Sequence, residues 1–123
     1  MIWEIMQEWA KCRDAMLPAI AMTDGTHIED DVIAGLLGGQ YKLWVAGASG
    51  IVTEFIKFPR VKCLNVFLAG GDLTELAPLR GAIERHAMAN GCTRMTALFA
   101  RPGWIRWFGD DVKTCGTYAY KDF

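Results

Sequence analysis

The chain has 123 residues, of which 52% are apolar and 22% charged, and its formal net charge is −1. This is the composition of one folded domain, residues 1–123, with a hydrophobic core. The net charge gives no argument for nucleic-acid binding, for which a basic domain is expected, and none for an anionic membrane surface, so we expect neither as a partner.

Membrane insertion and metal binding also find no support. The longest weakly polar stretch, residues 43–52, is interrupted by glycine and serine, whereas a bilayer span needs about 20 apolar residues. The N-terminus lacks the basic residues of a signal peptide, so we expect a cytoplasmic protein. The four cysteines are far apart, without a C-x-x-C pair, and only two histidines are present. We therefore expect reduced, mostly buried thiols and no metal site.

Two helices are predicted first. Apolar residues recur at steps of three and four over residues 2–16, which indicates an amphipathic helix that Pro18 stops or kinks. After the loop "AMTDGT", Thr26 and Glu29 have the T-x-x-E spacing of a capping box. This predicts a second helix over residues 27–37, ended by a glycine pair.

Five alternating segments and two further helices follow in the remaining chain. "YKLWVAG", "IVTEFIKF" and "VKCLNVFLA" predict an antiparallel meander with short turns. A helix over residues 73–90 then leads to "TRMTALFA", a fourth strand. "PGWIRWFG" predicts a short helix, and "VKTCGTYAYKDF" predicts the last strand. The crossover makes the third strand, near residues 61–69, and the fourth, near residues 93–100, parallel neighbours.

These elements predict an α/β fold. Its sheet is mixed and mostly antiparallel, has about five strands, and carries helices on both faces.

The order of elements resembles the GNAT (N-acetyltransferase) superfamily without its usual first strand. The resemblance covers nearly the whole chain, and its local features are "AIERHAMANGCTRMTALFA" and "WIRWFGDDVKTCGTYAYKD". In this family a helix ending in glycine leads into the fourth-strand position, and a short helix with an aromatic–aromatic–glycine end leads into the last strand. Small phage-encoded GNAT-like proteins have a similar build.

The resemblance implies an acyl-CoA site where the third and fourth strands splay apart. The family holds the pyrophosphate on a loop of pattern [QR]-x-x-G-x-[GA] that enters the central helix. Here the glycine positions fall near residues 74–76, where Glu75 would place a carboxylate beside the phosphate. Candidate cofactor-binding residues are therefore the preceding Gly70, Gly71, Asp72 and Leu73. Alternatively, the glycines only make a turn, and Asp72 and Glu75 cap the next helix.

The resemblance also implies a general base and a general acid. Family enzymes often place a Glu on the third strand of the meander and a Tyr on the short last helix. Glu54, on the preceding strand, is the candidate catalytic base, although an outward-facing, solvated carboxylate is the alternative. The position of the Tyr is occupied by tryptophan and phenylalanine. His86 is expected on the exposed side of its helix.

The segment "RPGWIRWF" is rich in arginine and tryptophan, both of which are enriched at interface hot spots. Trp104, Arg106 and Trp107 are therefore candidate interaction residues. We expect Trp104 and Phe108, four residues apart, to face the core, and Trp107 and Arg106 to lie on the surface.

Two functions fit these features. The first is an acetyl-CoA-dependent N-acyltransferase. The second is a non-catalytic or degenerate relative that serves as a structural or interaction module, with a protein partner or a second copy of the chain. Such a module would be cytoplasmic, or located in the virion if the protein is phage-encoded. The missing phosphate-binding pattern and the missing Tyr favour the second function.

Overall fold

The structure is a computed structural model that describes residues 2–98 and 102–123. Its elements are, in chain order, α1 (Ile2–Ala21), α2 (Glu29–Leu37), β1 (Tyr41–Ala46), β2 (Ser49–Lys57), β3 (Lys62–Gly70), α3 (Leu73–Leu76), α4 (Leu79–Ala89), β4 (Arg94–Thr96), α5 (Pro102–Ile105) and the 3-10 helix η1 (Arg106–Phe108).

The strands form one mixed sheet in the order β1-β2-β3-β4. β1, β2 and β3 are an antiparallel meander, and β3 pairs with β4 in parallel. The predicted meander and the predicted strand–helix–strand crossover are therefore confirmed, with α3 and α4 in the crossover. The alternating segments formed strands where another alternating segment, close to them in the sequence, could pair with them.

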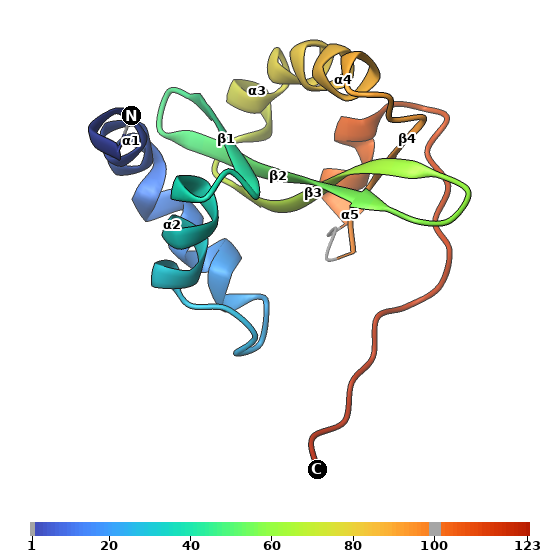
Figure 1. Ribbon diagram of the computed structural model, residues 1–123, viewed down its shortest axis with the longest axis horizontal. Coiled ribbons are helices and arrows are strands. Elements are labelled where there is room, and N and C mark those ends of the chain that lie inside the picture. Colours follow the sequence, from blue (N-terminus) through green and yellow to red (C-terminus); the bar gives the residue numbers. More distant parts are fainter. Residues whose placement is uncertain (1, 99–101) are drawn as a thin grey trace.

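The described residues contain four strands, so the expectation of about five is wrong. Residues 112–123 form no strand, are exposed along their whole length, and run outside the sheet (Figure 1). The Tyr120 hydroxyl donates to Asp24 of the α1–α2 loop at 2.8 Å. β4 is also shorter than predicted: residues 97 and 98 continue without pairing, and residues 99–101 lie outside the described part. Alternation makes a segment compatible with a sheet, but a strand exists only where another strand supplies hydrogen bonds.

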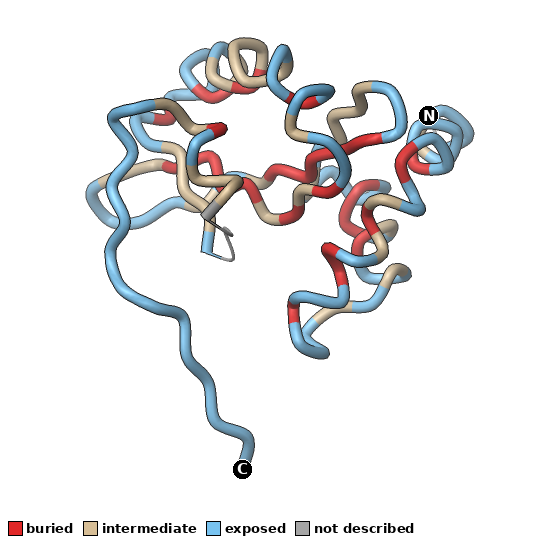
Figure 2. Tube along the Cα trace, turned by 180° about the vertical axis from the view of Figure 1, so that it is seen from behind, coloured by how far each residue is buried: buried red, intermediate tan, exposed pale blue. Residues whose placement is uncertain are grey.

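Helices cover both faces of the sheet, as predicted (Figure 1). On one face, α1 and α2 pack over a core that includes Trp9, Met16, Val52 and Leu68. On the other face, α3, α4 and the α5–η1 segment pack over a second core. Its buried residues are Ile51, Leu64, Val66, Leu76, Ile83, Ala87, Cys92 and Trp107. Figure 2 shows that the buried residues follow the central strands and the inner sides of the helices.

The predicted amphipathic helix is confirmed, and it continues past Pro18 to Ala21, so Pro18 does not stop it. Proline lacks the N–H that would bond to the carbonyl of residue 14, which weakens a helix interior. The last turn forms nevertheless, because Ala19 and Ile20 are buried in the first core and Met22 N donates to the Pro18 carbonyl.

Helix α2 begins at Glu29, and the predicted capping box of Thr26 with Glu29 does not form. Instead, the Asp31 carboxylate accepts a hydrogen bond from Ile28 N at 2.9 Å, while the Thr26 hydroxyl bonds to the His27 ring. Glu29 is directed towards α1, where it accepts bonds from other side chains. Glu29 therefore makes a tertiary contact with α1 in place of the capping contact that the local sequence pattern predicted.

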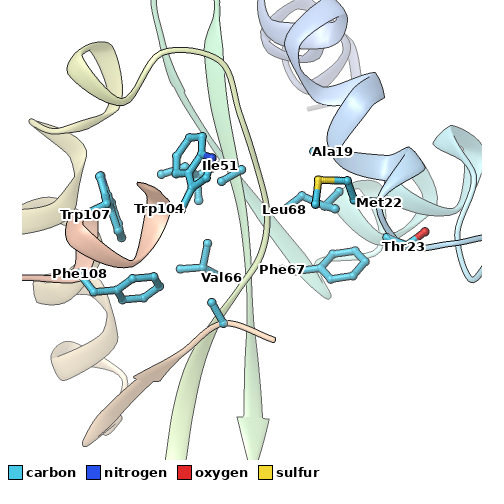
Figure 3. A pocket seen from close by; sticks show the side chains of 12 residues that line it. Ala19, Met22, Thr23, Ile51, Val66, Phe67, Leu68, Trp104, Trp107 and Phe108 are labelled. Atoms are coloured by element: carbon cyan, nitrogen blue, oxygen red, sulfur yellow. The ribbon is translucent and has the colours of Figure 1, made fainter. Parts of the chain in front are cut away.

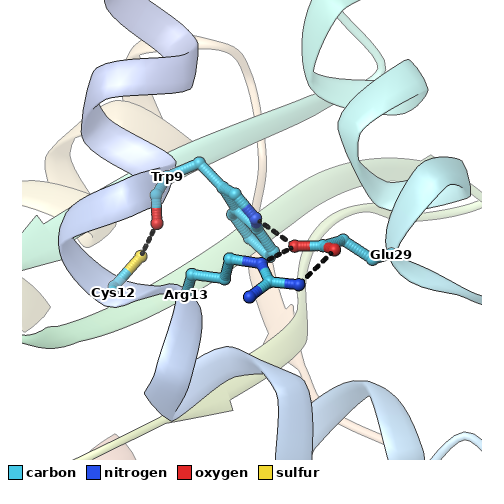
Figure 4. A network of polar contacts seen from close by, with 4 residues as sticks. All are labelled: Trp9, Cys12, Arg13 and Glu29. Atoms are coloured by element: carbon cyan, nitrogen blue, oxygen red, sulfur yellow. Dashed lines mark hydrogen bonds and ion pairs between the residues drawn. The ribbon is translucent and has the colours of Figure 1, made fainter.

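The Glu29 carboxylate joins α1 to α2 (Figure 4). It accepts hydrogen bonds from Arg13 Nε at 2.6 Å, from Arg13 Nη2 at 3.0 Å and from the Trp9 indole at 2.8 Å. The Arg13 guanidinium and then the Trp9 N–H stabilise the charged form, and they lower the pKa of Glu29 below its ordinary value.

This contact predicts a pH dependence of stability. Because the folded-state pKa of Glu29 is lowered, its contribution is complete above the unfolded-state pKa and is lost as the pH falls through the folded-state pKa. We expect the difference in urea unfolding midpoint between the wild type and Glu29→Gln to be largest at neutral pH and to shrink in acid. A difference that stays constant with pH would contradict this assignment.

Candidate functional site

The candidate site lies where β3 and β4 part. The two strands pair only from Cys63 with Arg94 to Asn65 with Thr96, and β3 continues beyond this point to Gly70. In this half of β3, which is not paired with β4, pairing with β2 continues: Val52 of β2 pairs with Leu68, and the next pair is Thr53 with Val66. Phe67 is therefore an extra residue, a bulge that turns its ring towards the α1–α2 core.

An apolar cavity occupies the opening beside the unpaired half of β3 (Figure 3). Trp104, Trp107 and Phe108 line it on one side of the strand, and Met22 and Thr23 line it on the other. Its volume is ≈ 50 Å³. Small-molecule sites measure roughly 300–1,000 Å³. The cavity therefore has room for a few small atoms but not for a cofactor as large as acyl-CoA.

The turn from β3 into α3 is closed by internal hydrogen bonds. Asp72 N donates to Ser49 Oγ at 2.9 Å, and Ser49 Oγ donates to Glu75 Oε1 at 2.6 Å. Thr74 N donates to the Asp72 carboxylate at 2.8 Å, so Asp72 caps α3. Ser49 stands between Asp72 and Glu75, so the predicted direct capping box between those two residues is wrong. We call Ser49, Asp72 and Glu75 the Ser49 network.

Gly70 and Gly71 serve close packing at this turn. A Cβ on Gly70 would overlap the Ala15 carbonyl of α1, and a Cβ on Gly71 would overlap the Ser49 side chain. Gly71 also has φ +105°, which disfavours any other residue. The double glycine therefore lets α1 and Ser49 approach the β3–α3 turn. Leu73, the fourth candidate cofactor residue, packs against the second core.

Glu54 belongs to a row of polar side chains that crosses three strands. Thr96 Oγ1 on β4 donates to Asn65 Oδ1 on β3 at 2.9 Å, and Asn65 Nδ2 donates to Glu54 Oε2 on β2 at 2.9 Å. Asn65 and Thr96 form the last paired rung of β3 and β4. Glu54 is half-buried and is not one of the residues that line the cavity.

The structure places Trp107 in the core, so its expected surface position is wrong. Its side chain is 8% exposed, and its indole N–H donates to the Leu76 carbonyl at 3.1 Å. Trp104 and Phe108 are only half-buried, whereas Arg106 is exposed, as predicted. Trp104 of α5 and Trp107 of η1 are three residues apart, a spacing that puts side chains on one side of a helical segment, and both pack in the second core.

His86 faces the sheet, contrary to the expectation of an exposed position. Its ring lies 5.5 Å from that of Trp44 and 5.4 Å from that of Phe55, measured between centroids. Burial and then the nearby Lys42 charge lower its pKa. Alternation along β1 and β2 places both aromatic residues on this face, but the sequence alone did not show that α4 would lie across them.

The structure thus brings only Trp104 and Trp107 of the predicted site residues to the cavity. Gly70, Gly71 and Asp72 form the β3–α3 turn, and Glu54 lies in the polar row. Sequence reasoning missed Ser49, Asn65 and Thr96. Small polar residues in strands carry no local signal of the distant partners that they bond to.

Comparisons with protein-family models, with curated proteins and with solved structures gave no match. In the part of the chain that the structure describes, His, Cys, Asp and Glu side chains form no group of three or more suited to a metal ion. No helix among residues 2–98 and 102–123 combines the length and the hydropathy that a bilayer crossing requires.

The four cysteines are free: three are buried and Cys115 is exposed. This confirms the expectation of mostly buried thiols. Burial raises the pKa of Cys12 to about 11, which keeps that thiol protonated at neutral pH.

Proposed function

We propose that this chain is a GNAT-like interaction module that does not use acyl-CoA. The Ser49 network carries the proposal. Acyl-CoA binding of the family type needs free backbone N–H groups at the entry to the helix after β3. Here Asp72 N and Thr74 N already donate to the Ser49 hydroxyl and to the Asp72 carboxylate.

Electrostatics support the same conclusion. A pyrophosphate at this turn would meet the carboxylates of Asp72 and Glu75 and would have to displace the hydrogen bonds that Ser49 makes. Like charges at close range repel, and the lost bonds would leave buried polar groups unpaired. The small volume of the cavity between β3 and β4 adds a steric argument.

An acetyl-CoA-dependent N-acyltransferase is the second candidate function. Two observations favour it: the parting of β3 from β4, and the presence of Glu54 in a polar row that ends at that point. Against it, the Glu54 carboxylate is held by Asn65 and lies outside the cavity lining. A general base must reach the proton that it removes, and Glu54 borders a different surface pocket, beside Tyr41 and Phe55.

Calorimetric titration with acetyl-CoA and with CoA tests the proposal. We expect a dissociation constant at or above about 1 mM, or about −4 kcal/mol or less favourable. Glu75→Gln is the control, because it keeps an acceptor for Ser49 while it removes one negative charge. Its affinity should stay equally weak, since the N–H groups remain occupied. Low-micromolar binding by the wild type, with turnover that Glu54→Gln abolishes, would establish the acyltransferase instead.

A further inference from the structure

β1 is an outer strand of the sheet, and its outer edge is open in the described part of the chain. It comes first in the strand order, and none of its six residues is buried, whereas residues 49–53 of the neighbouring β2 are. Among the described residues, no backbone group outside the β1–β2 pair bonds to β1. The strand has no proline and no bulge, and Lys42 is its only charged residue. Proteins usually protect an edge with such features, so β1 is a template for another strand.

The pairing of β2 determines which backbone groups of β1 face outwards. Phe58 N donates to the Val61 carbonyl of the β2–β3 turn at 2.9 Å, so the even-numbered residues of β2 bond to β3. The odd-numbered residues therefore bond to β1, in the pairs Ser49 with Ala46, Ile51 with Trp44 and Thr53 with Lys42. By alternation, the N–H and C=O groups of Tyr41, Leu43 and Val45 point away from the sheet.

This edge is complementary to the same edge of a second copy. If two β1 strands pair antiparallel about a two-fold axis at Leu43, Tyr41 of each copy meets Val45 of the other, and every outward-facing group finds a partner. Each Lys42 then lies opposite Trp44 of the other copy, and lysine over tryptophan is a contact that β1 already makes within one chain, at 5.0 Å from Nζ to the ring centroid. An axis at Lys42 would place two lysines opposite each other, and an axis at Trp44 would leave Tyr41 unpaired. The register about Leu43 is therefore favoured.

The C-terminal segment of the same chain is not placed to fill this edge. Residues 112–123 leave the sheet on the side of β4 and α5, whereas β1 is at the other end of the strand order (Figure 1). The Tyr120 hydroxyl also bonds to Asp24 of the α1–α2 loop. A strand from an unrelated protein would satisfy the open groups of one chain only. A second copy satisfies those of both chains in one symmetric contact, so it is the occupant that this edge fits.

We propose that β1 pairs antiparallel with β1 of a second copy, about a two-fold axis at Leu43, and so joins two four-stranded sheets into one continuous sheet. This inference deepens the proposed function, on which it rests, because it names the partner of the interaction module and the surface that binds it.

Amide hydrogen exchange, followed by NMR over a concentration series of the full-length protein, tests the contact. The amides of Lys42 and Trp44 bond to β2, so they should exchange slowly at every concentration. The amides of Tyr41, Leu43 and Val45 should exchange fast in dilute solution and about tenfold more slowly, or less, once the dimer forms. Protection of only two of these three amides would place the axis at another residue and contradict the proposed register.

Leu43→Pro and Leu43→Ala are a matched pair of variants for sedimentation velocity. Both lose the leucine side chain, but only proline removes the outward-facing N–H at the axis, and the bonds from β1 to β2 remain in both. Circular dichroism establishes that each variant is folded. We expect Leu43→Pro to dimerise at least about tenfold more weakly than Leu43→Ala, because it loses hydrogen bonds at the centre of the contact. If Leu43→Pro does not fold, amide exchange in the wild type decides.

Each contrary outcome overturns the inference. A wild type that stays monomeric up to about 1 mM does not use the edge in this way. Equal association of the two variants, or a dimer whose outward amides still exchange fast, means that another surface is the interface. Slow exchange of these amides at every concentration means that the same chain covers the edge. Failure here leaves acetyl-CoA binding weak, whereas failure of the proposed function appears as tight binding in the calorimeter, so the two failures are distinguishable.

Discussion

Trp107→Ala is expected to lower the free energy of unfolding by about 3–5 kcal/mol, the usual cost of truncating a buried aromatic side chain to alanine. The indole is buried in the second core, and it donates a hydrogen bond to the Leu76 carbonyl of α3. The substitution leaves both a cavity and a buried carbonyl without its donor. Small domains are stable by only about 5–15 kcal/mol, so a loss of this size removes a large fraction of the free energy that keeps the protein folded.

Urea denaturation followed by circular dichroism measures this effect. Trp107→Phe is the matched variant: it keeps an aromatic ring but loses the N–H, so its cost should be smaller, about 1–3 kcal/mol. Arg106→Ala, at the exposed neighbouring position, should leave stability within about 0.5 kcal/mol. A loss of less than about 1 kcal/mol in Trp107→Ala would show that the tryptophan is not a core residue, and would return it to the interaction surface.

Gly70→Ala is expected to be the second severe substitution, with a cost of about 1–3 kcal/mol or more. The added Cβ would overlap the carbonyl of Ala15 in α1. Both groups belong to backbone in regular structure, so no side-chain rotation can relieve the clash. Gly50, which pairs with Gly70 across β2 and β3, lies against α1 in the same way, because a Cβ added there would lie only 2.8 Å from Cys12 Sγ. Helix α1 would have to lift from the sheet.

The matched control for Gly70→Ala is Gly81→Ala, in the first turn of α4. There the nearest atom to an added Cβ is Arg85 Nη1 at 3.2 Å, the far end of a flexible side chain. Alanine is the better helix former by about 1 kcal/mol, so this variant should be as stable as the wild type or more so. Equal thermal or urea midpoints for the two alanine variants would refute the proposed contact between α1 and Gly70.

The sequence by itself determined the order of the helices, the antiparallel meander and the parallel crossover from β3 to β4. These features depend on hydrophobic period and on stop signals at glycine, and such signals act over a few residues. It also indicated an exposed Arg106 and mostly buried cysteines, because the physical preferences of these residue types are strong.

Only the tertiary structure decided which partner each side chain found. Ser49 bonds to Glu75 across 26 residues of sequence, and Trp107 bonds to Leu76 across 31. Glu29 bonds to Arg13 of α1 instead of capping its own helix. Residues 112–120 form no strand, although their apolar residues alternate as in a strand. The physical reason is the same in each case. Periodicity states which surface a segment can bury, but the surface that it meets is set by packing between distant parts of the chain.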